Sequence, residues 1–235
     1  MTVLRGIIFD KDGTLFDFAS TWEAWAAAFL RRLAQDDAHA EELGKAIGFD
    51  VPTMRFSPDS VVIAGTPGEI AEALHSLLPG VSVAAALHIL NEEAARAPQK
   101  EATPLPAFLD TLSGHGYTLG VVTNDAEAPA RAHLDAAGVT DRFDFIAGFD
   151  SGYGAKPAPG QLLAFAEASD LNPSEVLMVG DSLHDLIAAR NAGMRAVGVL
   201  TGMATVDVLT PYAEIVLPDI GHLADWLTAE NLRPV

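Results

Sequence analysis

The chain has 235 residues, 49% of them hydrophobic, which is enough for one large domain or two unequal domains with a packed core. Its net charge is −18, from 14 Lys and Arg against 32 Asp and Glu, and such a surface repels nucleic acid and anionic lipid. No apolar run approaches the roughly 20 residues of a membrane span, no export signal is recognisable, and cysteine is absent. We therefore expect a cytoplasmic protein without disulfide bonds.

Six apolar segments predict β-strands. They cover residues 3–9, 118–123, 143–148, 176–180, 196–200 and, with a weaker pattern, 214–217. Helical segments such as 159–168 and 183–192 alternate with them, and Gly193 is placed to end the second of these helices. Near-continuous apolar strands separated by helices are typical of a parallel sheet covered on both faces. The sequence thus predicts an α/β fold with a doubly wound, Rossmann-like parallel sheet.

Residues 18–102 interrupt this alternation because they contain no convincing strand. Trp22, Trp25 and Phe29 recur at helical spacing, and the stretch is too long for a loop. Its centre, residues 48–58, looks irregular. We predict a helical insertion between the first strand and the rest of the sheet, so that the chain divides into a core of residues 1–17 and 103–235 and an inserted domain of residues 18–102.

Polar side chains follow the predicted strands or lie in the loops between them. They are Asp10 and Asp12, Thr123 and Asn124, Lys156, and Asp181, Ser182 and Asp185. Each group on its own also has an ordinary explanation, as a turn at the end of a strand or, for Lys156, as a residue of a surface loop. However, the carboxyl ends of parallel strands meet at one edge of the sheet, where ligands bind in open α/β folds. We expect these residues to converge on one crevice.

The same residues form an ordered set of motifs. They are Asp10-Lys11-Asp12-Gly13-Thr14, Thr123-Asn124, Lys156-Pro157 and Gly180-Asp181-Ser182 with Asp185. The set resembles the four motifs of the haloacid dehalogenase-like (HAD) hydrolase superfamily, and the helical insertion resembles the C1-type cap of that family. Thr103-Pro104-Leu105 and residues 188–193 are similar to its phosphoglycolate phosphatase-like branch.

The resemblance implies a covalent mechanism. Asp10 would attack phosphorus and form an aspartyl-phosphate, which divides the hydrolysis into two displacements. Asp12 would protonate the leaving alkoxide and then deprotonate water. Thr123 and the backbone amide of Asn124 would bind phosphate oxygens, and Lys156 would supply a positive charge. Gly13 and Thr14 would form the turn that moves as the cap closes over the site.

A cation is required because an anionic nucleophile must approach an anionic phosphate. Two unit charges 4 Å apart repel by about 4 kcal/mol at an effective dielectric constant of 20. Hard oxygen ligands beside a phosphate suit Mg²⁺. The resemblance implies that Asp10 and Asp181 supply carboxylates and Asp12 its carbonyl oxygen, while Asp185 supports the metal through water. Ser182 is placed to cap the following helix.

Other residues near the motifs have weaker signals. Arg55 is our candidate for reaching a substrate anion from the insertion, although a solvent-exposed arginine on an acidic protein explains it better. Trp22 could line the site, but its helical spacing with Trp25 and Phe29 favours a place in the core of the insertion. Lys11 is expected to alter the surroundings of the site rather than the reaction class. Asp125 is assigned to the start of a helix, and no metal-binding spacing includes His184.

The function that the resemblance implies is a Mg²⁺-dependent phosphatase acting on a small phosphorylated metabolite, with 2-phosphoglycolate as the first specific candidate. Two alternatives stay open. One is an isomerase like β-phosphoglucomutase, which moves phosphate within a sugar. The other is a catalytically silent binding protein on the same scaffold. The expected partner is a small molecule, with no role for nucleic acid or membrane, and the sequence leaves the oligomeric state open.

Overall fold

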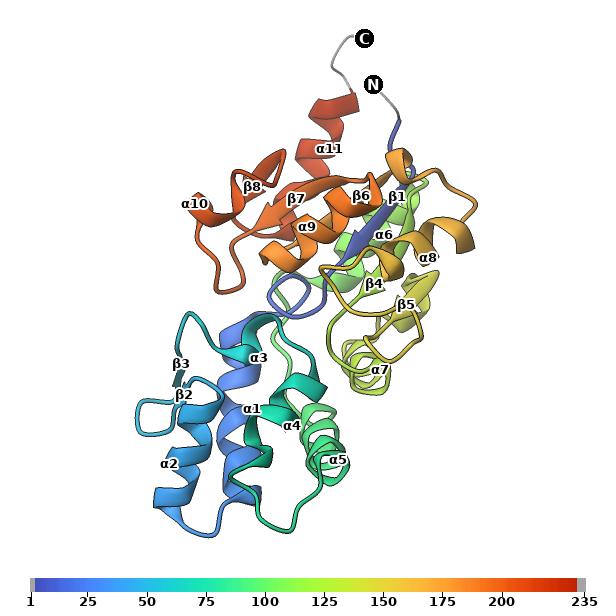
Figure 1. The fold of residues 1–235 in the computed structure, drawn as a ribbon. Helices are drawn as coiled ribbons and strands as arrows, with labels where there is room; N and C mark the ends of the chain where they lie inside the picture. The colour runs from blue at the N-terminus through green and yellow to red at the C-terminus, as the bar shows by residue number, and fades with distance from the viewer. Residues whose placement is uncertain (1–2, 232–235) are drawn as a thin grey trace.

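The computed structural model describes residues 3–231 and contains one large sheet of six parallel strands (Figure 1). The strand order is β5-β4-β1-β6-β7-β8, so the first strand lies in the middle of the sheet. The strands are β1 (Gly6–Phe9), β4 (Thr118–Val122), β5 (Phe145–Ala147), β6 (Val176–Gly180), β7 (Arg195–Val199) and β8 (Ile215–Leu217). Because β1 pairs with β4 on one side and β6 on the other, the chain after each of these three strands emerges at the same edge.

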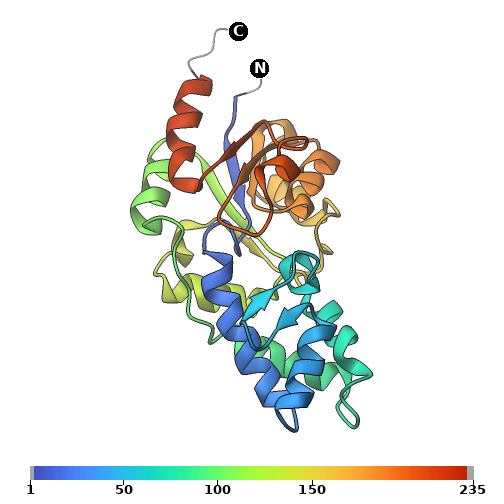
Figure 2. The same ribbon diagram turned by 90° about the vertical axis from the view of Figure 1, so that its left-hand side faces the viewer.

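Helices cover both faces of this sheet, as Figure 2 shows. They are α6 (Leu105–Gly114), α7 (Glu127–Ala136), α8 (Gly160–Ala168), α9 (Leu183–Ala192), α10 (Val206–Leu209) and α11 (Leu223–Asn231), with 3₁₀ turns η1 (Thr140–Arg142), η2 (Pro173–Glu175) and η3 (Ile220–His222). Successive strand residues point to opposite faces. Ile7 and Phe9 therefore pack with α6 and α11, whereas Ile8 packs with α8 and α9.

The doubly wound parallel sheet predicted from the sequence is confirmed. All six predicted strands are present, and their ends differ from the prediction by at most three residues. The helices at 160–168 and 183–192 are also as predicted, and Gly193 ends the second in the left-handed conformation with a φ of +73°. None of the helices in residues 3–231 combines the length and apolarity that crossing a bilayer would require.

The helical insertion lies beyond the carboxyl edge of the sheet, in the lower half of Figure 1. Its helices are α1 (Phe18–Leu33), α2 (Asp37–Ala46), α3 (Val61–Ala64), α4 (Pro67–His75) and α5 (Val83–Ala94). Their apolar faces enclose a hydrophobic core of their own, in which Trp22, Trp25 and Phe29 are buried. This burial explains the helical spacing of the aromatic residues, because one face of α1 turns toward the other helices.

The expectation that the insertion contains no strand is wrong in one detail. A short antiparallel hairpin joins β2 (Phe49–Asp50) to β3 (Arg55–Phe56). The rings of Phe49 and Phe56 contact across it, with their centroids 4.8 Å apart. Strands of two residues are too short to produce an alternating pattern, so the sequence carries no readable signal for them.

Candidate functional site

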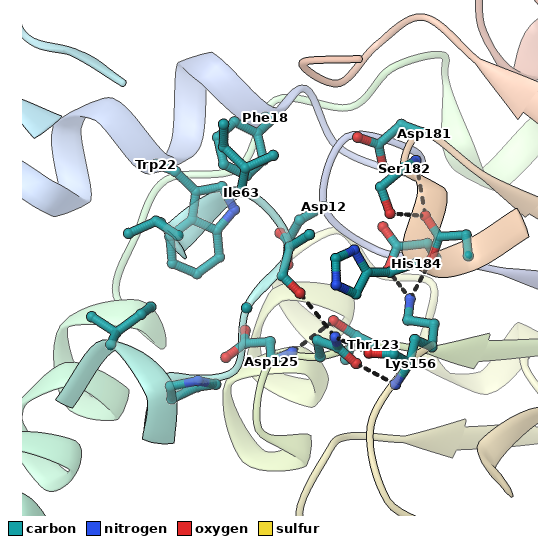
Figure 3. Close-up of a pocket in the computed structure, with 18 of the residues that line it drawn as sticks. Asp12, Phe18, Trp22, Ile63, Thr123, Asp125, Lys156, Asp181, Ser182 and His184 are labelled. Atoms are coloured by element: carbon teal, nitrogen blue, oxygen red, sulfur yellow. Dashed lines mark hydrogen bonds and ion pairs between the residues drawn. The ribbon is translucent and has the colours of Figure 1, made fainter. Parts of the chain in front are cut away.

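The strand ends bring the predicted site residues together in one pocket between the sheet and the insertion (Figure 3). It encloses about 560 Å³, part of it open to solvent. The core residues that line it are Asp10, Asp12, Thr123, Asn124, Asp125, Lys156, Asp181, Ser182, His184 and Asp185. Eight residues of the predicted site are among them, contributed by the loops after β1, β4 and β6, the loop before α8, and the first turn of α9.

Lys156 is at the centre of the hydrogen bonds in this pocket. Its Nζ lies 2.6 Å from Asp10 Oδ1, 2.7 Å from Asp185 Oδ1 and 3.0 Å from the carbonyl oxygen of Val122. An ammonium group has three protons, so these three acceptors use all of them. The ammonium group therefore fixes the orientation of the Asp10 carboxylate.

Asn124 holds the backbone on which Lys156 sits. Its Oδ1 accepts a hydrogen bond from the Lys156 backbone N–H at 2.9 Å, and its Nδ2 donates to the Lys156 carbonyl oxygen at 2.9 Å. The same Nδ2 also donates to the carbonyl oxygen of Ala64, at the end of α3 in the insertion. One side chain thus connects two core loops and the insertion.

Thr123 lies at the end of β4 and is almost completely buried. Its Oγ1 accepts a hydrogen bond from the backbone N–H of Asp125 at 3.0 Å, and its carbonyl oxygen accepts one from Gln161 Nε2 at 3.0 Å. The hydroxyl proton of Thr123 stays available for an acceptor in the pocket, because accepting the bond from Asp125 does not use it.

Three carboxylates form a cluster that can hold a metal ion. Oxygen atoms of Asp10, Asp181 and Asp185 lie within 4.8 Å of one another, and all three residues are buried. Gly13 and Thr14 border this cluster, with Thr14 Oγ1 3.4 Å from Asp181 Oδ1 and Gly13 in a turn with a φ of +84°. Buried carboxylate oxygens are the ligands that hard divalent cations prefer, so the residues present fit such an ion.

The pKa values show that the negative charge of the cluster is not fully compensated. Burial raises the pKa of Asp10 to about 7, and Asp185 and Asp12 add to this rise while Lys156 opposes it. Burial also raises the pKa of Asp181 well above its usual range, with repulsion from Asp10 and Asp185 contributing. For Lys156, burial acts to lower the pKa, but the attraction of Asp10 and Asp185 raises it overall. Lys156 is therefore charged, and the cluster favours a further cation.

Ser182 and Asp185 cap helix α9, as predicted for Ser182. The backbone N–H and the hydroxyl of Ser182 donate to Asp185 Oδ2 at 3.0 Å and 2.7 Å. Asp185 therefore uses one carboxylate oxygen to fix the start of the helix and the other to bind Lys156.

A second buried cluster surrounds Lys11, which has no exposure to solvent. Its Nζ lies 2.7 Å from Asp12 Oδ1, 3.2 Å from Asp125 Oδ2 and 3.0 Å from His133 Nδ1. The Nε2 of His133 contacts the carbonyl oxygen of Ala94 at 2.7 Å, so Nε2 carries the proton and Nδ1 accepts from Lys11. Burial, together with the nearby ammonium group, lowers the pKa of His133 to about 4. The cluster thus joins Asp12 to the last residue of α5.

The assignment of Asp125 to a helix start therefore needs correction. Helix α7 begins at Glu127, and Asp125 Oδ1 accepts only from the backbone N–H of Ala126 just before it. The other oxygen of Asp125 pairs with Lys11, and the residue lines the pocket. An aspartate two residues before a helix looks like a cap in the sequence, and nothing in the sequence pairs it with a lysine more than a hundred residues away.

The two candidate residues of the insertion, Arg55 and Trp22, lie in different places. Arg55 is not among the residues that line the pocket; its side chain is 70% exposed and its Nη1 lies 2.9 Å from Glu23 Oε1. Trp22 belongs to the core of the insertion, as its spacing indicates, and also forms part of the pocket wall. Arg55 is therefore not positioned to reach a ligand in this pocket.

Comparisons with known proteins agree with this architecture. The family model described as haloacid dehalogenase-like hydrolase matches residues 4–193. The chain is 30% identical over 206 residues to the Dickeya dadantii protein named "Probable phosphatase IndB", covering 86% of this chain and 84% of that protein. It is 31% identical over 244 residues to the phosphoglycolate phosphatase of Neisseria meningitidis, covering 98% and 94%. The crystal structure of a predicted phosphoglycolate phosphatase from Haemophilus somnus has the same fold, with a TM-score of 0.73 at 21% identity over 96% of this chain and 99% of that chain.

Proposed function

Because the chain belongs to the haloacid dehalogenase-like hydrolases, we propose that it hydrolyses a small phosphate monoester with Mg²⁺ and with Asp10 as the nucleophile. The observation that carries the proposal is the buried arrangement in which Lys156 fixes Asp10, Asp12 follows two residues later, and Asp181 and Asp185 complete the acidic cluster. The phosphatase names of the relatives support phosphomonoester hydrolysis as the reaction class.

The first displacement uses the two aspartates of the β1 loop. Lys156 binds Oδ1 of Asp10, and the other carboxylate oxygen attacks phosphorus, so that a P–O bond to Asp10 forms while the P–O bond to the leaving alkoxide breaks. Asp12 gives its proton to that alkoxide. In the second displacement Asp12 accepts a proton from water, whose oxygen attacks phosphorus while the P–O bond to Asp10 breaks. This step releases inorganic phosphate and returns Asp10 to its carboxylate form.

Charge in the pocket must balance the phosphate. We propose that the carboxylates of Asp10 and Asp181 and the carbonyl oxygen of Asp12 hold Mg²⁺, with Asp185 supporting it through water. When bound, the ion neutralises phosphate charge that would otherwise repel Asp10. Lys156 contributes a fixed positive charge beside the nucleophile, and the Thr123 hydroxyl and the Asn124 backbone N–H bind phosphate oxygens.

We further propose that residues 18–102 act as a cap over the core of residues 1–17 and 103–235. The turn at Gly13 and Thr14 would allow the cap to close and exclude bulk water. The pocket is lined by both parts, which supports this division of labour. A small metabolite in the cytoplasm is the proposed substrate, and the names of the relatives make 2-phosphoglycolate the first compound to test.

The test is phosphate release from a panel of phosphate monoesters, with Mg²⁺ and with a chelator, by the wild-type protein and the Asp10→Asn variant. We expect release that requires Mg²⁺ and falls by at least about 1000-fold in Asp10→Asn, because no carboxylate nucleophile remains. Unfolding curves should show that the variant stays folded. Substantial turnover by Asp10→Asn would refute the covalent mechanism, and conversion of a sugar phosphate to its isomer without release would favour the mutase.

A further inference from the structure

The two walls of the pocket differ sharply in chemistry. The core wall carries five carboxylates, the ammonium group of Lys156 and the imidazole of His184, and the ammonium group of Lys11 lies behind Asp12 and Asp125. Carboxylates therefore outnumber ammonium groups here before any metal binds. The wall from the insertion is apolar and aromatic, and its main residues are Phe18, Trp22, Trp25, Val62, Ile63 and Ile70. Because Asp10 attacks phosphorus from the core side, the alcohol part of a bound ester faces the apolar wall.

The insertion offers no positive charge to that alcohol in the part of the chain that the structure describes. Its basic residues are Arg31, Arg32, Lys45, Arg55, Arg96 and Lys100, and none of them lines the pocket. Arg55 pairs with Glu23, and Arg32 pairs with Glu92 at 2.8 Å. On the core side, Lys156 already uses its three protons. Lys11 contacts Asp12, Asp125 and His133 in the same way. A carboxylate on the alcohol would therefore face five aspartates whose two ammonium partners are already engaged.

The apolar wall contains two indole N–H groups that donate no hydrogen bond. The Nε1 atoms of Trp22 and Trp25 are buried and have no hydrogen-bond partner. The residues are 6% and 2% exposed, and their rings meet edge to face with centroids 4.9 Å apart. In Figure 3 the indole nitrogen of Trp22 lies on the side that faces Asp12. An indole N–H can only donate, and leaving it unpaired in an apolar environment is costly, so this position favours a ligand acceptor.

We propose that the substrate is the phosphate ester of an uncharged, mainly apolar or aromatic alcohol that offers a hydrogen-bond acceptor to Trp22. The inference rests on the proposed phosphatase function and narrows it to a substrate class. It departs from the expectation of 2-phosphoglycolate, because the alcohol part of that compound carries a carboxylate. An aromatic alcohol fits the ring surfaces of Phe18 and Trp22, and a neutral acceptor satisfies the indole N–H without adding negative charge to the pocket.

Two matched pairs of esters test the charge requirement. One pair is 2-phosphoglycolate and its neutral amide, and the other is benzyl phosphate and 4-carboxybenzyl phosphate. We expect the neutral member of each pair to have a kcat/KM higher by about tenfold or more, because like charges brought together in a buried site are strongly disfavoured. Equal values, or a preference for the carboxylates, would overturn the inference while leaving the phosphatase function intact. No release from any of the four esters would overturn both.

Two substitutions test the placement of the alcohol. Trp22→Phe keeps an aromatic ring but removes the indole N–H donor. Benzyl phosphate is the reference compound, because it has no hydrogen-bond acceptor beyond its phosphate. The ratio of kcat/KM for the amide of 2-phosphoglycolate to that for benzyl phosphate should therefore fall in this variant. General damage to the fold would lower both values together. Ile63→Lys places a cation in the apolar wall and should raise the ratio of kcat/KM for 2-phosphoglycolate to that for its amide. If both ratios stay at the wild-type value, this wall does not contact the alcohol and the inference fails.

Discussion

Lys11 is a charged residue with no exposure to solvent, on the same loop as Asp10 and Asp12. Burial acts to lower the pKa of Lys11, yet the attraction of Asp12 and Asp125 raises it overall, so the ammonium group stays charged. Asp125 shows the reverse balance, because burial raises its pKa to about 6 despite the nearby Lys11. The ammonium group and the two carboxylates therefore depend on one another at a site where the Lys11 side chain is fully buried and the carboxylates are mostly buried.

Replacing Lys11 should reveal this dependence. Lys11→Met keeps the length of the side chain but leaves the carboxylates of Asp12 and Asp125 without their cation. We expect the free energy of unfolding, measured in urea near neutral pH, to fall by about 3–5 kcal/mol, the usual cost of removing one partner of a buried pair.

A surface ion pair on the same part of the fold provides the matched control. Arg131 Nε lies 2.8 Å from Glu127 Oε1, and the side chains are 45% and 33% exposed. Arg131→Met should lower the free energy of unfolding by less than about 1 kcal/mol, since exposed pairs are screened by solvent. If Lys11→Met costs no more than this control, the buried cluster contributes little to stability.

At the scale of elements, two loops far apart in the sequence close around Asp181. The turn after β1 brings Gly13 close to the carboxylate, where an added Cβ would lie 2.5 Å from its oxygen. The loop after β7 brings Gly202 even closer, with an added Cβ 1.6 Å from Asp181 Oδ2. Thr201 ties the two loops together by donating from Oγ1 to the carbonyl oxygen of Gly13 at 2.6 Å. Only residues without a side chain fit against this carboxylate.

Gly202→Ala should therefore displace Asp181 or the loop that faces it. We expect kcat/KM to fall by about 100-fold or more and the apparent affinity for Mg²⁺ to weaken, because catalytic groups lose much of their effect when they move by about 1 Å. The assay is phosphate release titrated with Mg²⁺. Gly114→Ala is the control, since a Cβ there meets nothing within 4 Å, and it should leave both values unchanged. If Gly202→Ala and Gly114→Ala have the same kcat/KM and the same apparent affinity for Mg²⁺, contact between residue 202 and Asp181 does not matter for the site.

At the scale of the whole molecule, the sequence predicts the sheet and the motif residues well, and for physical reasons. Buried parallel strands need continuous apolar runs, and their carboxyl ends must meet at one edge, so the convergence of Asp10, Lys156 and Asp181 follows from the topology. The contacts of Lys11 with Asp125 and His133 cannot be predicted from the sheet topology. Its partner His133 lies on α7, and no periodicity links a lysine in one loop to a histidine on a helix 122 residues later.

The sequence leaves open whether the aromatic residues of the insertion reach the pocket. Helical spacing shows that Trp22 is buried, but it cannot show that the buried face also borders the catalytic edge of the sheet. Arg55 shows the same ambiguity, because a lone arginine in an acidic chain fits either an anion receptor or an exposed side chain, and the structure shows it exposed and paired with Glu23. Such placements depend on how the insertion packs against the core, which local patterns do not encode.

The acidity of the whole chain complicates any test of metal binding. With a net charge of −18, every added cation relieves repulsion across the surface, so salt alone should stabilise the protein. A specific site must therefore be separated from this general effect. The three buried carboxylates provide the means, because Asp181 belongs to the cluster but makes no ion pair with Lys156, which contacts Asp10 and Asp185.

Mg²⁺ should raise the melting temperature of the wild-type protein beyond the effect of NaCl at equal ionic strength. At a concentration 100 times Kd, ligand binding stabilises the folded state by about 2.7 kcal/mol, which corresponds to about 5–10 °C for a chain of this size. The measurement belongs at about pH 8, above the pKa of about 7 of Asp10, so that the Asp10 carboxylate is ionised. Asp181→Asn should respond to Mg²⁺ only as it responds to NaCl, because it loses a ligand while its surface charge changes little. If the variant gains as much as the wild type, the ion binds elsewhere on the acidic surface and the buried cluster is not the metal site.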